Sequence, residues 1–309
     1  MQQQKISILG IGWLGGALAK QLLLDPQYLV LGSSRNEDRH KDMLEYYERV
    51  SEEGLQSSKS HPQQLASTLT PADIGGSSSH QEDQAVASRW QAFRIQVPDF
   101  TPRDDAFFQA DVLVITLPPG RRRADVVTAY PQEIEAILSK AVAQRCKHII
   151  YTSSTGVYGH AKGIVTEASP LAPQTESAKA VVKAEEAIMR SEVSATILRL
   201  AGLYGPMRHP GRWFAQKPQI PNGDAPVNLV HQSDVVTAIM AVIQQDAWGE
   251  IYNVCTHNHP PKGVFYAQAT LSLGYPAPDS TPGGSDGKVV SAEKIQRALG
   301  WSPRPLVIP

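Results

Sequence analysis

Residues 5–18 read KISILGIGWLGGAL, and this stretch decides the fold. The apolar run Lys5–Leu9 predicts a strand, and leucines at every fourth position from Leu14 to Leu22 predict a helix with one apolar face. A second apolar run, Tyr28–Leu31, predicts another strand. A strand, a turn, a helix and a strand within about thirty residues form a βαβ unit.

The turn inside this unit has the pattern GxGxxG and runs from Gly10 to Gly15. Gly10 permits a tight turn, Gly12 lets a pyrophosphate approach the backbone, and Gly15 lets helix and strand pack closely. Trp13 and Leu14 open the helix, whose free N–H groups and partial positive charge suit phosphates. The pattern therefore predicts a dinucleotide site, with a purely structural glycine turn as the alternative.

The end of the second strand reads Gly32-Ser33-Ser34-Arg35 and contains no carboxylate. Sites that prefer NAD usually place an acid there to bind the ribose 2′-hydroxyl. The hydroxyls of Ser33 and Ser34 and the guanidinium of Arg35 suit a 2′-phosphate instead. We therefore expect NADP(H) as the preferred cofactor and NAD as the alternative. The opposing interpretation is that Arg35 is a solvated surface residue.

Further along the chain, strands alternate with helices, which predicts a Rossmann-type α/β fold with a doubly wound parallel sheet. Strands are expected at 93–97, 111–118, 148–154 and 195–200, and helices at 129–144 and 175–191. Ligands of such sheets bind beyond the carboxyl ends of the strands, so Thr116, Leu117 and Pro118 are expected to contact the cofactor.

The same pattern divides the chain. Residues 1–201 are expected to form the dinucleotide-binding domain. Within this domain, a helix-like stretch at 37–53 is followed by a mobile insertion at 54–88 that is rich in Ser, Gln, His and Gly. Residues 202–309, broken by Gly and Pro, are expected to form a small C-terminal substrate lobe. Within it, residues 227–254 are expected to return to the sheet, with strands at 227–230 and 250–254.

Composition excludes several classes of protein. The chain has 309 residues, of which 41% are hydrophobic, and its 29 Lys and Arg nearly balance its 30 Asp and Glu, so it lacks the basic excess of a nucleic-acid-binding protein. No apolar run approaches the roughly 20 residues of a membrane span, and the N-terminus lacks the pattern of a signal peptide. Cys146 and Cys255 lie in apolar segments and are expected to be buried thiols of a cytoplasmic protein.

Several motifs occur in one order: GIGWLGG, IIYTSSTGVYG, RLAGLYGP, VNLVHQSDVV and GEIYNV. Together they resemble the extended short-chain dehydrogenase/reductase family, which includes NAD-dependent epimerases and dehydratases. The run RLAGLYGPMRHPGRWFA is similar to an atypical bacterial branch, the YeeZ-like proteins. The resemblance implies a small-molecule substrate, such as a nucleotide sugar or another anionic metabolite, and a homodimer.

The family's active site holds a Ser or Thr, then a Tyr and a Lys spaced as YxxxK. The resemblance places Ser154 at the first position and Lys179 at the lysine, which also holds the cofactor ribose. The tyrosine position is Thr175, because the segment reads TESAK. A phenol has a pKa of about 10 that a nearby cation brings into working range, whereas an aliphatic hydroxyl ionises far less readily. The proton donor would then be Tyr158, water or the substrate.

Other positions also depart from the family pattern. Gly202 stands where epimerase-like members often have Asn, and Thr155 and Gly156 replace the acidic pair of dehydratases, so sugar dehydration is not expected. Asp234 is expected to cap a helix.

Two arginine-rich segments, 121–123 and 208–212, are candidates for binding an anionic substrate, with a solvated surface as the alternative. His257 and His259 have neither helical spacing nor a nearby ligand cluster, so no metal site is expected. The leading function hypothesis is an NADP(H)-dependent oxidoreductase or epimerase-like enzyme with an altered active site. The alternative is a non-catalytic NADP(H)-binding sensor or regulatory protein.

Overall fold

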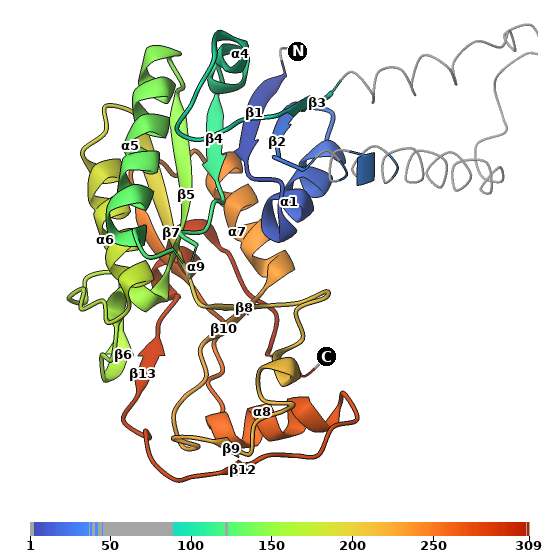
Figure 1. Cartoon of the computed structure of the whole chain (residues 1–309), viewed down its shortest axis with the longest axis vertical. Helices are drawn as coiled ribbons and strands as arrows, with labels where there is room; N and C mark the ends of the chain where they lie inside the picture. The colour runs from blue at the N-terminus through green and yellow to red at the C-terminus, as the bar shows by residue number, and fades with distance from the viewer. Residues whose placement is uncertain are drawn as a thin grey trace, which may run out of the picture.

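The computed structural model describes residues 3–36, 38, 41–42, 45, 89–120, 123–306 and 308 (Figure 1). The expected insertion at 54–88 lies outside the described residues, as do most of the expected helix at 37–53 and the pair Arg121 and Arg122.

A seven-stranded parallel sheet forms the centre of the molecule, in the order β11-β7-β5-β4-β1-β2-β3. Its strands are β1 (Gln4–Leu9), β2 (Tyr28–Ser33), β3 (Trp90–Phe93), β4 (Val112–Ile115), β5 (His148–Ser154), β7 (Ser194–Leu200) and β11 (Ile251–Val254). All residues of β4 are buried because both faces of the sheet are covered. The expected Rossmann-type parallel sheet is confirmed.

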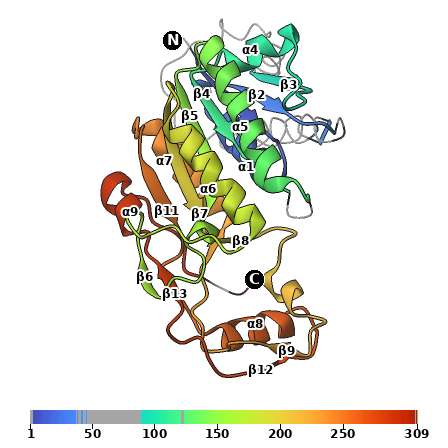
Figure 2. The same ribbon diagram turned by 60° about the vertical axis from the view of Figure 1, so that its left-hand side comes forward.

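Helices cover both faces of the sheet. On one face lie α1 (Trp13–Leu23) and α7 (Gln232–Gln244), and on the other lie α5 (Val126–Ala143) and α6 (Glu176–Met189) (Figure 2). Two apolar clusters separate the helices from the sheet, one for each pair. The short helix α4 (Asp105–Phe108) precedes β4, and α9 (Glu293–Leu299) lies beside β11. Among the described residues, no helix is long and apolar enough to cross a membrane.

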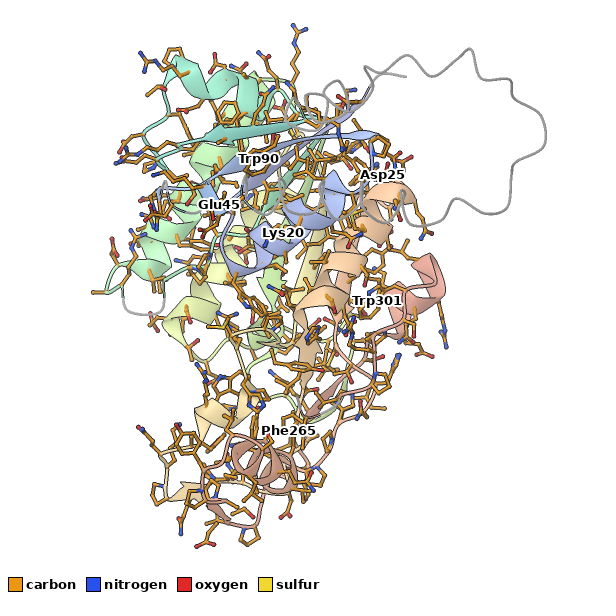
Figure 3. The ribbon with its side chains drawn as sticks, turned by 90° about the vertical axis from the view of Figure 1, so that its right-hand side faces the viewer. Lys20, Asp25, Glu45, Trp90, Phe265 and Trp301 are labelled. Atoms are coloured by element: carbon orange, nitrogen blue, oxygen red, sulfur yellow. The ribbon has the colours of Figure 1, made fainter. Side chains whose placement is uncertain are left out.

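A smaller lobe lies beyond the carboxyl ends of the strands (Figure 1). It contains α8 (Lys262–Leu271) and short strand pairs: β8 (Gly202–Tyr204) with β10 (Leu229–His231), and β9 (Gln219–Ile220) with β12 (Asp279–Ser280). A third pair, β6 (Gly163–Val165) with β13 (Lys288–Val290), lies along the edge near α6. The lobe has its own apolar core, in which Phe265 lies, well away from Lys20 on α1 (Figure 3).

Two strand expectations were wrong in position. The strand expected at 93–97 is β3, which begins at Trp90 because Trp90 pairs with Val30 and its ring lies against Gly32. A Cβ on Gly32 would lie 2.1 Å from Trp90 Cη2, so the absence of a side chain admits the ring.

The strand expected at 227–230 does not join the central sheet, whereas β11 does. Residues 229–231 instead form β10 and pair with β8, which continues the chain past the end of β7. The pairing is close: a Cβ on Gly202 would lie 2.6 Å from Leu229 Cδ2.

The capping residue of α7 is His231 rather than Asp234. The His231 side chain accepts a hydrogen bond from the Ser233 N–H. Asp234 lies in the first turn, where its Oδ1 accepts a hydrogen bond from Arg304 Nε at 3.0 Å. The carboxylate therefore complements the positive end of the helix without capping it.

His148 is the first residue of β5, and its burial leads to a prediction about how stability depends on pH. Its ring stacks on Trp248 with centroids 4.1 Å apart, and its buried Nδ1 has no hydrogen-bond partner among the described residues. Burial lowers the pKa of His148, Asp246 opposes this shift, and Lys147 adds to it. The unfolded chain therefore takes up the proton more readily than the folded chain.

Stability is expected to be complete above the ordinary histidine pKa of about 6.5 and to fall as the pH decreases below it, toward the lower folded value. Urea unfolding of the intact chain and of His148→Phe, which keeps a ring on Trp248, measures this. The variant is expected to lose less stability between about pH 8 and about pH 5.5. An equal loss in both proteins would assign the pH dependence to other groups, such as His231 and His259, whose pKa values burial also lowers.

Candidate functional site

The glycine turn leaves no room for side chains at two of its positions. Gly10 has a φ of +103°, and a Cβ there would lie 3.0 Å from Leu117 Cδ2. A Cβ on Gly15 would lie 2.3 Å from the carbonyl oxygen of Gly10. Helix α1 makes its first backbone bond from the Gly16 N–H to the Gly12 oxygen at 2.9 Å. The N–H groups of Trp13, Leu14 and Gly15 therefore face the open end of the helix, where a phosphate is stabilised.

Side chains of the two neighbouring strands hold this turn. Thr116, directly after β4, donates its hydroxyl to the Gly10 oxygen at 2.7 Å. Ser33, at the end of β2, is buried, and its hydroxyl accepts the Gly10 N–H at 3.2 Å. Both were expected to contact the cofactor, and both lie beside its expected site with hydroxyls that shape the turn.

The remaining residues expected around the cofactor lie on the same edge of the sheet. Ser34 and Arg35 follow β2, and Arg35 is exposed. The Ser34 N–H donates to the Phe93 oxygen at 3.1 Å, which fixes the chain just before Arg35. Leu117 packs against Gly10, and the next residue, Pro118, is exposed.

Ser154 and Thr175 both cap helical turns. Ser154 is exposed at the end of β5 and accepts the Gly156 N–H at 3.1 Å, at the start of the 3₁₀ turn η2 (Thr155–Tyr158). Thr175 accepts the Ala178 N–H at 3.2 Å at the start of α6. A Cβ on Gly156 would lie 4.0 Å from Ala178 Cβ, so η2 and the start of α6 are in contact. The fold therefore brings together the segments that carry Ser154 and Thr175.

Lys179 lies one turn after Thr175, exposed on α6. Its ammonium donates to Glu176 Oε1 at 2.7 Å. The pair is on the surface, so its attraction is weak and the lysine can exchange this partner for another at little cost.

Tyr158, the last residue of η2, is fully buried. Its hydroxyl donates to Asn253 Oδ1 at 2.7 Å and accepts from Arg199 Nη1 at 2.9 Å. Burial raises the pKa of Tyr158, which works against proton donation near neutral pH. The hypothesis that Tyr158 replaces the missing phenol is therefore corrected: its hydroxyl is closed off from a substrate, and its role is structural.

Sequence reasoning missed a buried ion pair next to this tyrosine. Arg199 of β7 and Glu185 of α6 are joined at 2.7 Å, with 4% of each side chain exposed. Ser153 also donates its hydroxyl to Glu185. The signal was present in the sequence, since a charged residue inside the apolar strand segment ILRL requires a buried partner.

A lysine that the sequence did not single out also supports η2. Lys288 of β13 donates to the carbonyl oxygens of Thr155 and Gly159, each at 2.9 Å. Burial lowers the pKa of Lys288. The turn after Ser154 is therefore held from the C-terminal part of the chain.

Two cavities of similar size are candidates for a substrate. One, of about 460 Å³, lies in the lobe and is lined by Gly205, Pro206, Met207, His209, Arg212, His231 and Leu273. The other, of about 470 Å³, lies beside α9. The lobe cavity is the better candidate because Trp13 Nε1, at the start of α1, donates to the Pro206 oxygen at 2.7 Å. This contact places the cavity next to the glycine turn.

The histidines of the segment 257–259 have other partners. His259 Nδ1 lies 3.0 Å from the Val227 oxygen, and His257 contacts Gln296. In the described part of the chain, no three His, Cys, Asp or Glu side chains gather as metal ligands would.

Comparison with known proteins agrees with this arrangement. Residues 132–255 match the model of the NAD dependent epimerase/dehydratase family. Protein YeeZ of Escherichia coli (strain K12) is 42% identical over 211 residues, which cover 66% of this chain and 76% of YeeZ. The chain belongs to the NAD-dependent epimerase/dehydratase family. The expected resemblance, including its YeeZ-like character, is confirmed.

Two solved structures share the fold over nearly the whole chain. UDP-glucuronic acid 4-epimerase from Bacillus cereus, in complex with NAD, superposes with a TM-score of 0.71 at 18% identity, covering 99% of this chain and 95% of the epimerase. A conserved protein of unknown function from Silicibacter pomeroyi gives a TM-score of 0.64 at 21% identity, with the same coverage. At these identities the likeness concerns the fold alone.

The glycine turn gives a stability prediction. Gly15→Ala places a methyl group against the Gly10 carbonyl, which cannot move away without distorting the turn, so we expect a loss of about 1–3 kcal/mol in the free energy of unfolding. The matched control is Gly16→Ala, where the nearest atom is 3.9 Å away. That change should stabilise α1 by up to about 1 kcal/mol. Equal urea midpoints for the two variants would contradict the close contact.

Thr175 gives a second prediction. Thr175→Ala removes the cap of α6 and is expected to cost about 1 kcal/mol in the free energy of unfolding. Thr175→Ser keeps the hydroxyl and should unfold at nearly the urea concentration of the unaltered chain. If both variants lose the same stability, the hydroxyl does not cap the helix.

Proposed function

We propose that this family member binds NADP(H) at the glycine turn and is an oxidoreductase or epimerase-like enzyme in which Thr175 replaces the acid/base tyrosine. The observation that carries the proposal is the geometry of the turn. Gly10 and Gly15 touch so closely that the start of α1 lies directly beyond β1, with its first N–H groups directed outward. Such an arrangement suits a pyrophosphate.

The preference for NADP(H) over NAD is supported at the end of β2. Arg35 is exposed there, next to Ser34, and no carboxylate follows the strand before Glu37. A 2′-phosphate would gain a charge-assisted hydrogen bond from Arg35 that a 2′-hydroxyl would not. The B. cereus relative is described in complex with NAD, which is the alternative for this chain.

Candidate binding groups for a substrate come from the end of β5, from the start of α6 and from the lobe cavity. Ser154 would orient a carbonyl or hydroxyl group, and Lys179 would leave Glu176 to hold the ribose. Arg212 in the lobe cavity favours an anionic metabolite, such as a nucleotide sugar. The nicotinamide itself supplies hydride transfer. Since Tyr158 is enclosed, the proton would come from water or from the substrate.

The second candidate function is a non-catalytic NADP(H)-binding sensor or regulatory protein. It is favoured by the state of the acid/base positions: the hydroxyl of Thr175 caps α6, and the ammonium of Lys179 is bound to Glu176. A screen of carbonyl compounds and nucleotide sugars that follows NADPH absorbance separates the two candidates. Turnover supports the enzyme, and binding without turnover across the screen supports the sensor.

We also propose the division into a dinucleotide-binding domain at 1–201 and a substrate lobe at 202–309, with residues 250–254 belonging to the sheet of the first. We further propose that the chain forms a homodimer through helices that flank the sheet. We also propose that it is located in the cytoplasm.

A calorimetric titration of the purified chain with NADPH and with NADH tests the cofactor. NADPH is expected to bind more tightly, and Arg35→Ala is expected to weaken NADPH about tenfold while leaving NADH unchanged. Arg190→Ala is the matched control, because Arg190 is exposed at the far end of α6. Equal affinity for the two nucleotides in the unaltered chain would reject the preference, and no binding of either would reject the proposed function.

A further inference from the structure

One side chain joins the glycine turn to the lobe. The indole of Trp13 donates to the Pro206 oxygen at 2.7 Å, and Gln232 Nε2 donates to the Trp13 oxygen at 2.6 Å. A Cβ on Gly205 would lie 3.3 Å from Trp13 Cζ2. The first residue of α1 is therefore fixed both to the chain after β8 and to the start of α7.

Arg208 lies on the face of the same indole. Its guanidinium carbon is 4.6 Å from the ring centroid of Trp13. A β-turn presents it, in which the Arg208 N–H donates to the Gly205 oxygen at 2.9 Å. Pro206 and Met207 are the central residues of this turn.

Met207 has a φ of +61°, a conformation that favours glycine, and the residue is 85% exposed. The strain at this position is therefore not offset by burial of the side chain. Unfavourable backbone conformations of this kind concentrate at functional sites. Here the turn sets the position of Arg208 on the ring.

Arg208 brings a second positive charge to the start of α1. The start of a helix carries a partial positive charge, and a second positive charge beside it is repelled. Within the ranges that the structure describes, no carboxylate forms an ion pair with Arg208. An anion that binds between the guanidinium and the first turn of α1 removes the repulsion and gains from both.

We propose that Arg208 is a further dinucleotide-binding residue, supplied by the lobe and held by Trp13, that contacts the pyrophosphate at the start of α1. The inference rests on the proposed function, because it requires the dinucleotide to bind at the glycine turn. Arginine suits this role because its planar fork can bond two phosphate oxygens at once. This role of Arg208 means that the lobe would hold the cofactor as well as the substrate, since Pro206 and Met207 also line the lobe cavity.

The test compares two ligands that differ in the pyrophosphate. NADPH has one, whereas adenosine 2′-phosphate keeps the group expected at Arg35 and lacks the pyrophosphate. Calorimetry on the full chain is expected to show that Arg208→Ala weakens NADPH about tenfold and leaves adenosine 2′-phosphate unchanged. The affinity of the variant for NADPH should also depend less steeply on salt, because one charge contact is lost.

Two further variants separate this role from a structural one. Trp13→Phe keeps an aromatic face under Arg208 but loses the indole N–H that bonds Pro206, so an intermediate loss of NADPH affinity is expected. Arg190→Ala removes an exposed arginine far from the turn and should bind both ligands as the unaltered chain does.

The possible outcomes distinguish the two proposals. If Arg208→Ala binds NADPH as tightly as the unaltered chain, or if it weakens both ligands equally, the role of Arg208 is refuted while the dinucleotide site stands. If the unaltered chain binds neither NADPH nor NADH, the proposed function fails and the role of Arg208 fails with it.

Discussion

The contact between Gly15 and the carbonyl of Gly10 is the constraint on which the rest of the structure depends. The chain leaves β1 at Leu9 and starts α1 at Trp13, which is feasible only if the helix rests directly on the turn. Ser33 and Thr116 then bond the turn from the strands on either side. Since parallel strands end at one edge, the same geometry determines where Ser154 emerges from β5.

The two halves of the candidate site, at the glycine turn and at the start of α6, use different kinds of chemical group. The half at the glycine turn uses backbone groups and short hydroxyls that are tied to the sheet. The half at the start of α6 consists of Thr175 and Lys179, which lie on the surface and bond to their own helix. Tyr158 does not compensate, because its hydroxyl belongs to the buried network around Arg199 and Glu185. Removing one partner from such a network leaves an unpaired buried charge, so the network resists change.

The sequence was sufficient for features that local patterns determine. The strand at 148–154 has the bounds expected from its apolar run, and Thr175 begins the helix expected there. Features that depend on distant partners were not accessible. The start of β3 depends on Trp90 meeting Gly32, and β10 depends on Gly202 admitting Leu229.

The candidate site shows the same division. The glycine turn could be predicted because its chemistry requires particular residues at fixed spacing. The burial of Tyr158 could not, since the 3₁₀ turn that contains it has no periodicity that indicates which way a side chain points. The pairing of Lys179 with Glu176 was also not evident, because a surface lysine has many partners within reach.

The hydrogen bonds of Lys288 have a consequence for the order in which parts of the candidate site form during synthesis. Its ammonium bonds the carbonyl groups of the turn after Ser154, although it lies 133 residues beyond Thr155 in the chain. During synthesis, the ribosome releases the sheet strands β1 to β7 long before it reaches Lys288. The glycine turn is therefore synthesised well before Lys288, whereas the turn beside Ser154 acquires this support only when the C-terminal segment emerges. A chain that ends before β13 would lack both hydrogen bonds that Lys288 donates to the turn after Ser154.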